Sequence, residues 1–200
     1  MHEAMSPHRQ EAENRLSPVG KKFFNLIEFD DQEELVLEIR KHSFGAVLIV
    51  LVGLFIILFF FAIAILLSIS FRNGLVGSTG SYSGALIGGA VILSGFAVFG
   101  ILLSVIVFIN DVIFVTNEKI AQVLYKNIIS RKVSQLNIGD VQDVTVNQNN
   151  IFARIFNYGT LVIETAGEQN NYIFSYVPRP ASASNLIIEA HESYVAKYGN

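Results

Sequence analysis

Two apolar stretches decide the fold of this chain: Phe44–Phe71, FGAVLIVLVGLFIILFFFAIAILLSISF, and Gly84–Ile109, GALIGGAVILSGFAVFGILLSVIVFI. Neither contains Asp, Glu, Lys or Arg. A helix needs about 20 residues to cross about 30 Å of hydrocarbon, so each stretch is long enough to span a membrane. We therefore expect two transmembrane helices. The first stretch does not fit a cleavable signal peptide, because the apolar core of a signal peptide is shorter and lies close to the N-terminus.

The charges around the two spans predict their orientation. Lys and Arg near the ends of a span favour the cytoplasmic side. The linker, residues 72–83, carries only Arg72. The outer flanks are more basic, with Lys21, Lys22, Arg40 and Lys41 before the first span and Lys119, Lys126, Arg131 and Lys132 after the second. We expect a multi-pass protein of the inner or plasma membrane with both termini in the cytoplasm.

Small residues recur four positions apart within the spans. The pairs are Ala64 with Ser68, Gly84 with Gly88, and Gly100 with Ser104. Such spacing lets helix backbones approach closely. Two interpretations stay open: ordinary packing between the two helices of one hairpin, or a face for self-association.

The sequence divides into six segments. Residues 1–20 are polar and show no helical or strand period, which predicts a disordered tail. Residues 21–43 predict a structured cytoplasmic approach to the membrane, either helix or strand. The other segments are the first span (44–71), an external loop (72–83), the second span (84–110) and a cytoplasmic domain (111–200).

The last segment has the pattern of an antiparallel β domain. Alternating or β-branched runs predict strands at Asp111–Thr116, Lys119–Lys126, Ile128–Ser134, Val141–Asn147, Thr160–Thr165 and Tyr172–Val177. Turn signals separate them, and Ala166–Asn171 predicts a hairpin turn. One helical face follows, formed by Leu186, Ile187, Ala190 and Tyr194. We expect one C-terminal helix that closes the domain.

The stretch NDVIFVTNEKIAQVLYKNIISRKVSQLNIGDVQDVTVNQNNIFARIFNYGTLVIETAG, residues 110–167, combines several motifs in a specific order. A Thr-Asn turn precedes an Ile-x-x-Val-x-x-Val segment, a short Phe/Arg segment, and Gly-Thr before an apolar strand. This order resembles the bacterial pleckstrin-homology-like (PH-like) membrane proteins of the two-helix type, over Leu35–Tyr194. The resemblance implies an α+β membrane protein in which a transmembrane hairpin is followed by a small PH-like antiparallel β-barrel or sandwich capped by a helix.

The inventory of reactive residues is poor for catalysis. With no cysteine there is no thiolate chemistry, and the four histidines show no zinc-binding spacing. The acidic run Asp30, Asp31, Glu33 and Glu34 lacks the glycine-bearing pattern of a calcium loop, and we interpret it as solvated charge. We expect no catalytic residues, no bound metal and no cofactor. The net charge of −3 also argues against nucleic acid as a partner.

The domain offers two groups of residues that could contact the membrane surface. Lys126, Arg131 and Lys132 could meet anionic lipid, although a solvated strand edge is the simpler interpretation. The segment Ile151–Phe156 carries Phe152, Ile155 and Phe156 around Arg154. It could dip into the membrane interface, but we expect its rings to fill the mouth of the barrel.

The sequence therefore predicts a non-enzymatic membrane protein. We expect its PH-like domain to serve protein–protein interaction or self-assembly at the membrane, so that its partners are the lipid bilayer and another protein or a second copy. The alternative is a small oligomeric channel or transport accessory subunit. The absence of ionisable residues within the spans makes that alternative weaker.

Overall fold

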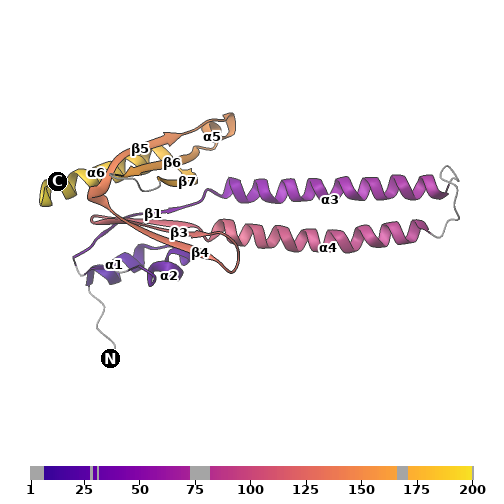
Figure 1. Cartoon of the computed structure of the whole chain (residues 1–200), viewed down its shortest axis with the longest axis horizontal. Coiled ribbons are helices and arrows are strands. Elements are labelled where there is room, and N and C mark those ends of the chain that lie inside the picture. The colour runs from indigo at the N-terminus through magenta and orange to yellow at the C-terminus, as the bar shows by residue number, and fades with distance from the viewer. Residues whose placement is uncertain (1–6, 28, 31, 73–81, 166–170, 200) are drawn as a thin grey trace, which may run out of the picture. The chain divides into compact units, whose positions relative to one another are not determined.

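The computed structural model describes residues 7–27, 29–30, 32–72, 82–165 and 171–199 (Figure 1). The chain divides into two compact units. One unit comprises residues 1–44 together with 107–200 and contains the β-sheets; we call it the domain. The other, residues 45–106, contains most of two long helices.

The two long helices confirm the predicted spans. They are α3 (Ser43–Arg72) and α4 (Tyr82–Ile109), and the segments Ser43–Ser70 and Gly84–Ile109 are long and apolar enough to cross a membrane. Their apolar side chains are largely exposed, for example Leu58 at 67% and Phe96 at 72%. Such surfaces need an apolar solvent, which identifies a membrane protein. Most of the predicted external loop lies outside the described residues.

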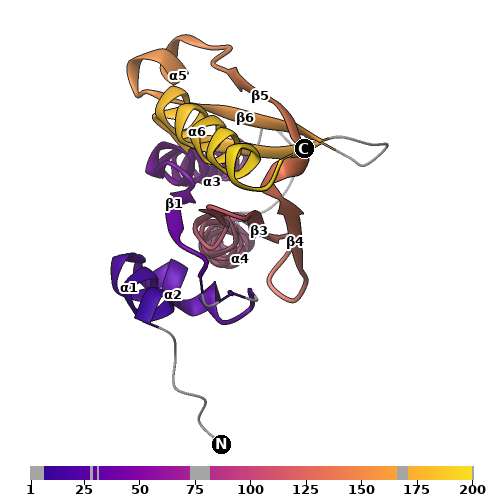
Figure 2. The same cartoon turned by 90° about the vertical axis from the view of Figure 1, so that its left-hand side faces the viewer.

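The domain contains two antiparallel sheets (Figures 1 and 2). In sheet A the order is β1 (Leu35–Arg40), β2 (Val112–Thr116), β3 (Lys119–Tyr125) and β4 (Arg131–Asn137). In sheet B it is β5 (Val141–Asn147), β6 (Tyr158–Thr165) and β7 (Tyr172–Pro178). A 3-10 turn, η1 (Ile138–Asp140), connects the sheets. The C-terminal helix, α6, spans Pro180–Tyr198. This sandwich with its closing helix confirms the predicted fold class.

The first strand of the domain precedes the membrane hairpin in the sequence. Strand β1 pairs with β2 in the register Ile39↔Ile113 and Arg40↔Val112. The predicted boundaries of 21–43 and 111–200 are therefore wrong, because the hairpin is inserted between two neighbouring strands of one sheet. Strand β2 needs a partner on each side to satisfy its backbone hydrogen bonds, and β1 supplies one of them.

The main core lies between the two sheets and α6. Its most enclosed members include Ile113, Ile120, Leu161, Phe174 and Ile187, each at most 1% exposed. Helix α6 buries Pro180, Ala183, Ser184, Ile187 and Ala190, whereas Leu186 is 36% exposed. The predicted face is therefore correct at Ile187 and Ala190 but wrong at Leu186, because the buried stripe is displaced around the helix.

Two N-terminal helices cover the other face of sheet A, as Figure 1 shows for α1 (Pro7–Arg15) and α2 (Pro18–Phe24). Phe23 and Phe24, both 1% exposed, form a second core with Val112, Phe114 and Val123. The expectation of a disordered tail over 1–20 is thus wrong for residues 7–20. These residues are mostly polar, but the few apolar ones among them bury the outer face of the sheet.

Helix α2 has a clear start signal. The hydroxyl of Ser17 accepts a hydrogen bond from the Gly20 N–H at 3.0 Å, and proline follows at the first helical position. Ser17 also donates its backbone N–H and its hydroxyl to the carboxylate of Glu38 on β1, at 2.7 and 2.5 Å. These bonds fasten the helix pair to the sheet.

The fourth strand begins later than predicted. Ile128–Ser134 is the predicted strand, but β4 spans Arg131–Asn137. The Asn127 side chain accepts the N–H groups of Ile129 and Ser130 at 3.0 and 2.7 Å, and so builds a turn. Ile128 and Ile129 therefore lie in this turn. The predicted hairpin turn at Ala166–Asn171 falls outside the described residues except for Asn171.

Candidate functional site

One ion pair marks the place where the chain leaves the domain for α3 and returns from α4. The ammonium nitrogen of Lys41 lies 2.5 Å from Oδ2 of Asp111, and both side chains are largely buried. The other oxygen of Asp111 accepts the Tyr125 N–H at 2.7 Å. Lys41 also lies 4.8 Å from the ring centroid of Phe108. The segment before α3 and the segment after α4 are therefore joined directly.

A group of aromatic rings lies at the same end of the domain; we call Phe44, Phe108, Phe156, Tyr158 and Tyr176 the junction rings. Phe44 stacks on Phe156 and Tyr158, with centroids 4.6 and 5.2 Å apart. Tyr176 lies 5.3 Å from both Tyr158 and Phe108. The junction rings thus connect sheet B to residues of α3 and α4 that belong to the domain.

Helix α5 (Ile151–Ile155) extends from this ring group. The side chain of Asn150 caps it by accepting the Ala153 N–H at 2.7 Å. Ala153 is 2% exposed, but the large apolar residues are exposed: Ile151 at 73%, Phe152 at 58%, Ile155 at 68% and Phe156 at 45%. The expectation that these rings fill the barrel mouth is therefore wrong. The small Ala153 makes the inward contact, so the bulky residues point outward.

The turn between β3 and β4 lies at the end of sheet A where the chain enters from α4. The register Val112↔Val123 and Tyr125↔Arg131 places it beside the first residue of β2. Ile129 is 97% exposed and Ile128 is 51% exposed. We call residues 126–132 the β3–β4 tip.

The four basic residues that the sequence offered as possible membrane contacts are divided between these two structures. Lys126, Arg131 and Lys132 are exposed on the β3–β4 tip, and Arg154 is exposed on α5. Within the domain, Figure 1 shows both structures at the end where β1 leads into α3 and α4 leads into β2. The sequence indicated these residues and the apolar residues around Arg154, but not Ile128 and Ile129 of the β3–β4 tip. Their exposure depends on turn geometry.

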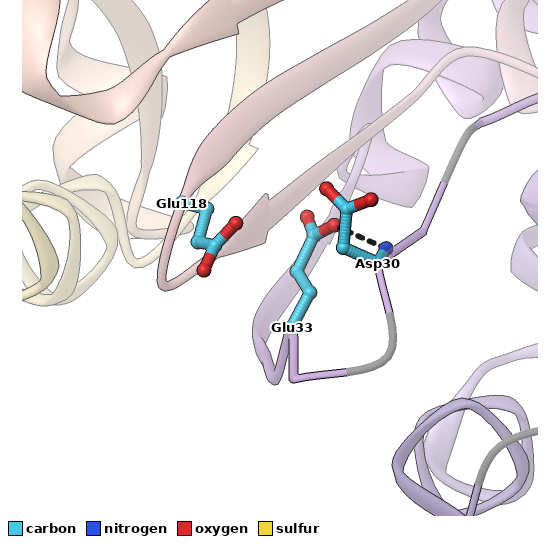
Figure 3. Close-up of side chains that lie close together, drawn as sticks. All are labelled: Asp30, Glu33 and Glu118. Atoms are coloured by element: carbon cyan, nitrogen blue, oxygen red, sulfur yellow. Dashed lines mark hydrogen bonds between the residues drawn. The ribbon is translucent and has the colours of Figure 1, made fainter.

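A second cluster joins the segment before β1 to the β2–β3 turn. Carboxylate oxygens of Asp30, Glu33 and Glu118 lie within 4.8 Å of one another (Figure 3). Glu33 is fully buried and also accepts the Asp30 N–H at 3.0 Å. The interpretation of the acidic run as solvated charge is therefore wrong for Glu33. Asp31, another residue of that run, lies outside the described residues.

The cation of this second cluster is a lysine. Nζ of Lys119 lies 2.9 Å from Glu33 and 3.6 Å from Asp30. Burial alone would lower the pKa of Lys119, but the hydrogen bond and charge of Glu33, with the charge of Asp30, outweigh this and raise the pKa. The arrangement is that of an ion-pair cluster between the Lys119 ammonium and the carboxylates of Glu33 and Asp30.

The small residues of the spans lie in different environments. Ala64 and Ser68 on α3 are 9% and 7% exposed. A side-chain carbon added at Gly84, Gly88 or Gly100 on α4 would meet nothing within 4 Å. Ser104 donates its hydroxyl to the Gly100 carbonyl at 2.8 Å, which satisfies it within its own helix.

The faces of α4 follow from a rotation of about 100° per residue. Gly89, Leu93 and Ala97 line an apolar groove between the helices, opposite Ala64 of α3. Gly84 and Gly88 lie on the other side of α4, whereas Gly100 and Ser104 lie on the groove side. Gly84 and Gly88 are therefore turned away from α3.

Comparison with known families gives one match. The model of the family described as "Bacterial PH domain" matches residues 35–191. This range begins at the first residue of β1 and ends within α6, so it includes the inserted hairpin. No curated protein and no solved structure matches the chain.

Proposed function

The chain belongs to the bacterial PH domain family, and on this premise we propose that it is a non-enzymatic, two-pass protein of the inner or plasma membrane. Both termini face the cytoplasm in this proposal. The domain binds a protein partner or a second copy of the chain. The lipid bilayer is its other partner, and nucleic acid, metal and cofactor are not.

The observation that carries the proposal is the outer edge of sheet A, formed by β4, where the Gln135 carbonyl already accepts the Tyr172 hydroxyl at 3.3 Å. Strand β4 pairs with β3 along seven positions, Lys119↔Asn137 to Tyr125↔Arg131, and is the last strand of its sheet in the described structure. Arg131, Lys132, Val133, Gln135 and Asn137 are exposed. An edge strand presents unpaired backbone groups, to which an extended segment of another chain can add as a further strand.

The membrane spans support a binding role better than a transport role. A pathway for ions or polar solutes usually needs an ionisable or polar lining at membrane depth. The groove between α3 and α4 is lined by apolar side chains and Ser94, whose hydroxyl donates to the Val91 carbonyl at 2.8 Å. This lining favours the domain, rather than the hairpin, as the functional part.

Photo-crosslinking of the full chain in native membranes tests the proposal. We would place a benzophenone amino acid at Val133 on β4 and, as a control, at Ile188 on α6; both residues are 39% exposed. We expect a discrete adduct from position 133 only. A mass of twice the chain indicates self-assembly, and another discrete mass indicates a protein partner. No adduct at 133, or the same adducts from 188, contradicts binding at this edge.

A further inference from the structure

We propose that α5 and the β3–β4 tip insert their exposed apolar side chains into the interface of the same bilayer that α3 and α4 cross. The ligand is a lipid surface that contains anionic headgroups. This inference does not depend on the proposed protein partner, since it concerns the end of the domain at the ring group, although Arg131 and Lys132 of the tip are also the first residues of β4.

The depth of α5 follows from its contact with a membrane span. Phe44 is the second residue of the span Ser43–Ser70, so it lies near the boundary of the hydrocarbon. The ring of Phe156 is stacked on it at 4.6 Å, and that of Phe152 at 6.0 Å. Side chains this close to Phe44 must lie at a similar depth. This argument needs only contacts within the domain.

The chemistry of α5 fits that depth. Ile151, Phe152, Ile155 and Phe156 are the exposed apolar residues of one short segment, and removing such surface from water is worth about 25 cal/mol per Å². Arg154 can lay its aliphatic stem along apolar surface and keep its guanidinium among the headgroups. Apolar residues with an interspersed cation are typical of segments buried about 5–10 Å into the interface.

The β3–β4 tip provides a second contact of the same kind. Ile129, at 97%, is the most exposed large apolar residue in the described structure. Lys126, Arg131 and Lys132 flank it, and each can contribute about 1 kcal/mol near an anionic surface. The ion pair of Lys41 with Asp111, and the bond from Tyr125 to Asp111, hold this end of sheet A beside the chain entering from α4.

A protein partner could also cover these residues, but the contact with Phe44 favours lipid. The apolar surface of α5 is continuous, through the stacked rings, with Phe44, the second residue of a segment that is long and apolar enough to cross a membrane. Two separate structures also combine exposed apolar residues with basic ones at this end of the domain. A lipid surface accommodates both at once without specific shape.

Fluorescence quenching in proteoliposomes tests the inference with the full chain. The protein has no cysteine, so single substitutions F152C, I155C and I129C can be labelled selectively with an environment-sensitive fluorophore. I188C on α6, with a 39% exposed parent residue, is the control. The vesicles contain phosphatidylglycerol, and the quenchers are a lipid carrying a nitroxide near its headgroup and, separately, aqueous iodide.

We expect labels at 152, 155 and 129 to lose most of their emission to the nitroxide lipid and to be protected from iodide. The label at 188 should keep most of its emission with the nitroxide lipid and should be quenched by iodide. Iodide quenching at 152 and 155 equal to that at 188 would overturn the inference, because it places α5 in water. Protection from both quenchers would also overturn it, because it indicates a protein cover.

Discussion

Lys41 and Asp111 form an ion pair, at 2.5 Å, between the residues that flank the inserted hairpin on its two sides. The side chain of Asp111 is only 5% exposed, and it also accepts a hydrogen bond from Tyr125. The pair thus couples β1, β2 and β3 at the point where two membrane spans meet one sheet.

The first prediction concerns this pair. The substitution D111A leaves the Lys41 ammonium without its carboxylate in a nearly dry site, and we expect it to destabilise the domain by about 3 kcal/mol. Tyrosine fluorescence can follow unfolding, because the chain has no tryptophan and six of its seven tyrosines, all but Tyr82, lie in the domain. The double variant K41M/D111N should lose less, since no charge is left unpaired. An equal loss in both variants would contradict the coupling.

The second prediction concerns the helices that cover sheet A. The substitution F24A removes a fully buried ring that packs against Phe114, and we expect a loss of about 3 kcal/mol. The side chains of Lys21 and Lys22 are already exposed, but release of α2 should unfold the backbone around them, so that trypsin cleaves there faster. The control is L26A, which alters a partly buried neighbour. No change in cleavage rate with F24A would show that the helices do not depend on this contact.

The sequence predicted the spans and most strands for a clear physical reason. Absence of charge over more than 20 residues has few explanations besides a membrane, and alternation identifies half-buried strands. The helices α1 and α2 were missed, yet one signal pointed to them. Strand β2 reads VIFVT and is buried at all five positions, as expected only for a strand covered on both faces.

The candidate site was less predictable than the fold. The basic residues Lys126, Arg131, Lys132 and Arg154 were indicated, but their meaning depends on Ile129 and on the rings of α5. Whether a short apolar run is buried or exposed follows from register and from the single inward contact of Ala153. Likewise, the pairing of Glu33 with Lys119 joins residues 86 positions apart, on either side of the hairpin. Local sequence patterns carry no information about the exposure of these apolar residues or about this ion pair.

The third prediction concerns pH. The pKa of Lys119 is raised in the folded domain because Glu33 and Asp30 favour its charged form more than burial disfavours it. The ion pairs of the Lys119 ammonium therefore contribute to the free energy of unfolding. That contribution is fully present below the ordinary lysine pKa of about 10.4, and it is lost as pH rises through the higher pKa of the folded state. Above about pH 10, calorimetry should therefore show a steeper loss of stability with pH for the wild type than for E33Q/K119M. Parallel curves would contradict the assignment. K119M alone should cost about 3 kcal/mol by leaving Glu33 unpaired.

The fourth prediction tests topology. Position 192 on α6 is exposed, and in the proposed orientation it faces the cytoplasm. A membrane-impermeant maleimide should therefore label the variant E192C only after the membrane is permeabilised. Because the chain has no other cysteine, the unsubstituted protein is the blank. Labelling of intact cells would place the domain outside and reverse the proposed orientation.

The last prediction separates the two interpretations of the small residues in the spans. If α4 mediates self-association, G88I should weaken it by at least about tenfold, about 1.4 kcal/mol, because a β-branched side chain on the face turned away from α3 keeps two copies apart. Donor and acceptor fluorophores on separate copies in liposomes measure this directly. The control, G89I, adds the same side chain on the groove side, where it can affect only the packing of α4 against α3 of the same chain. Unchanged association with G88I would show that the face of Gly84 and Gly88 does not mediate self-association. Equal association in all three proteins would leave the β4 edge as the surface for a second copy.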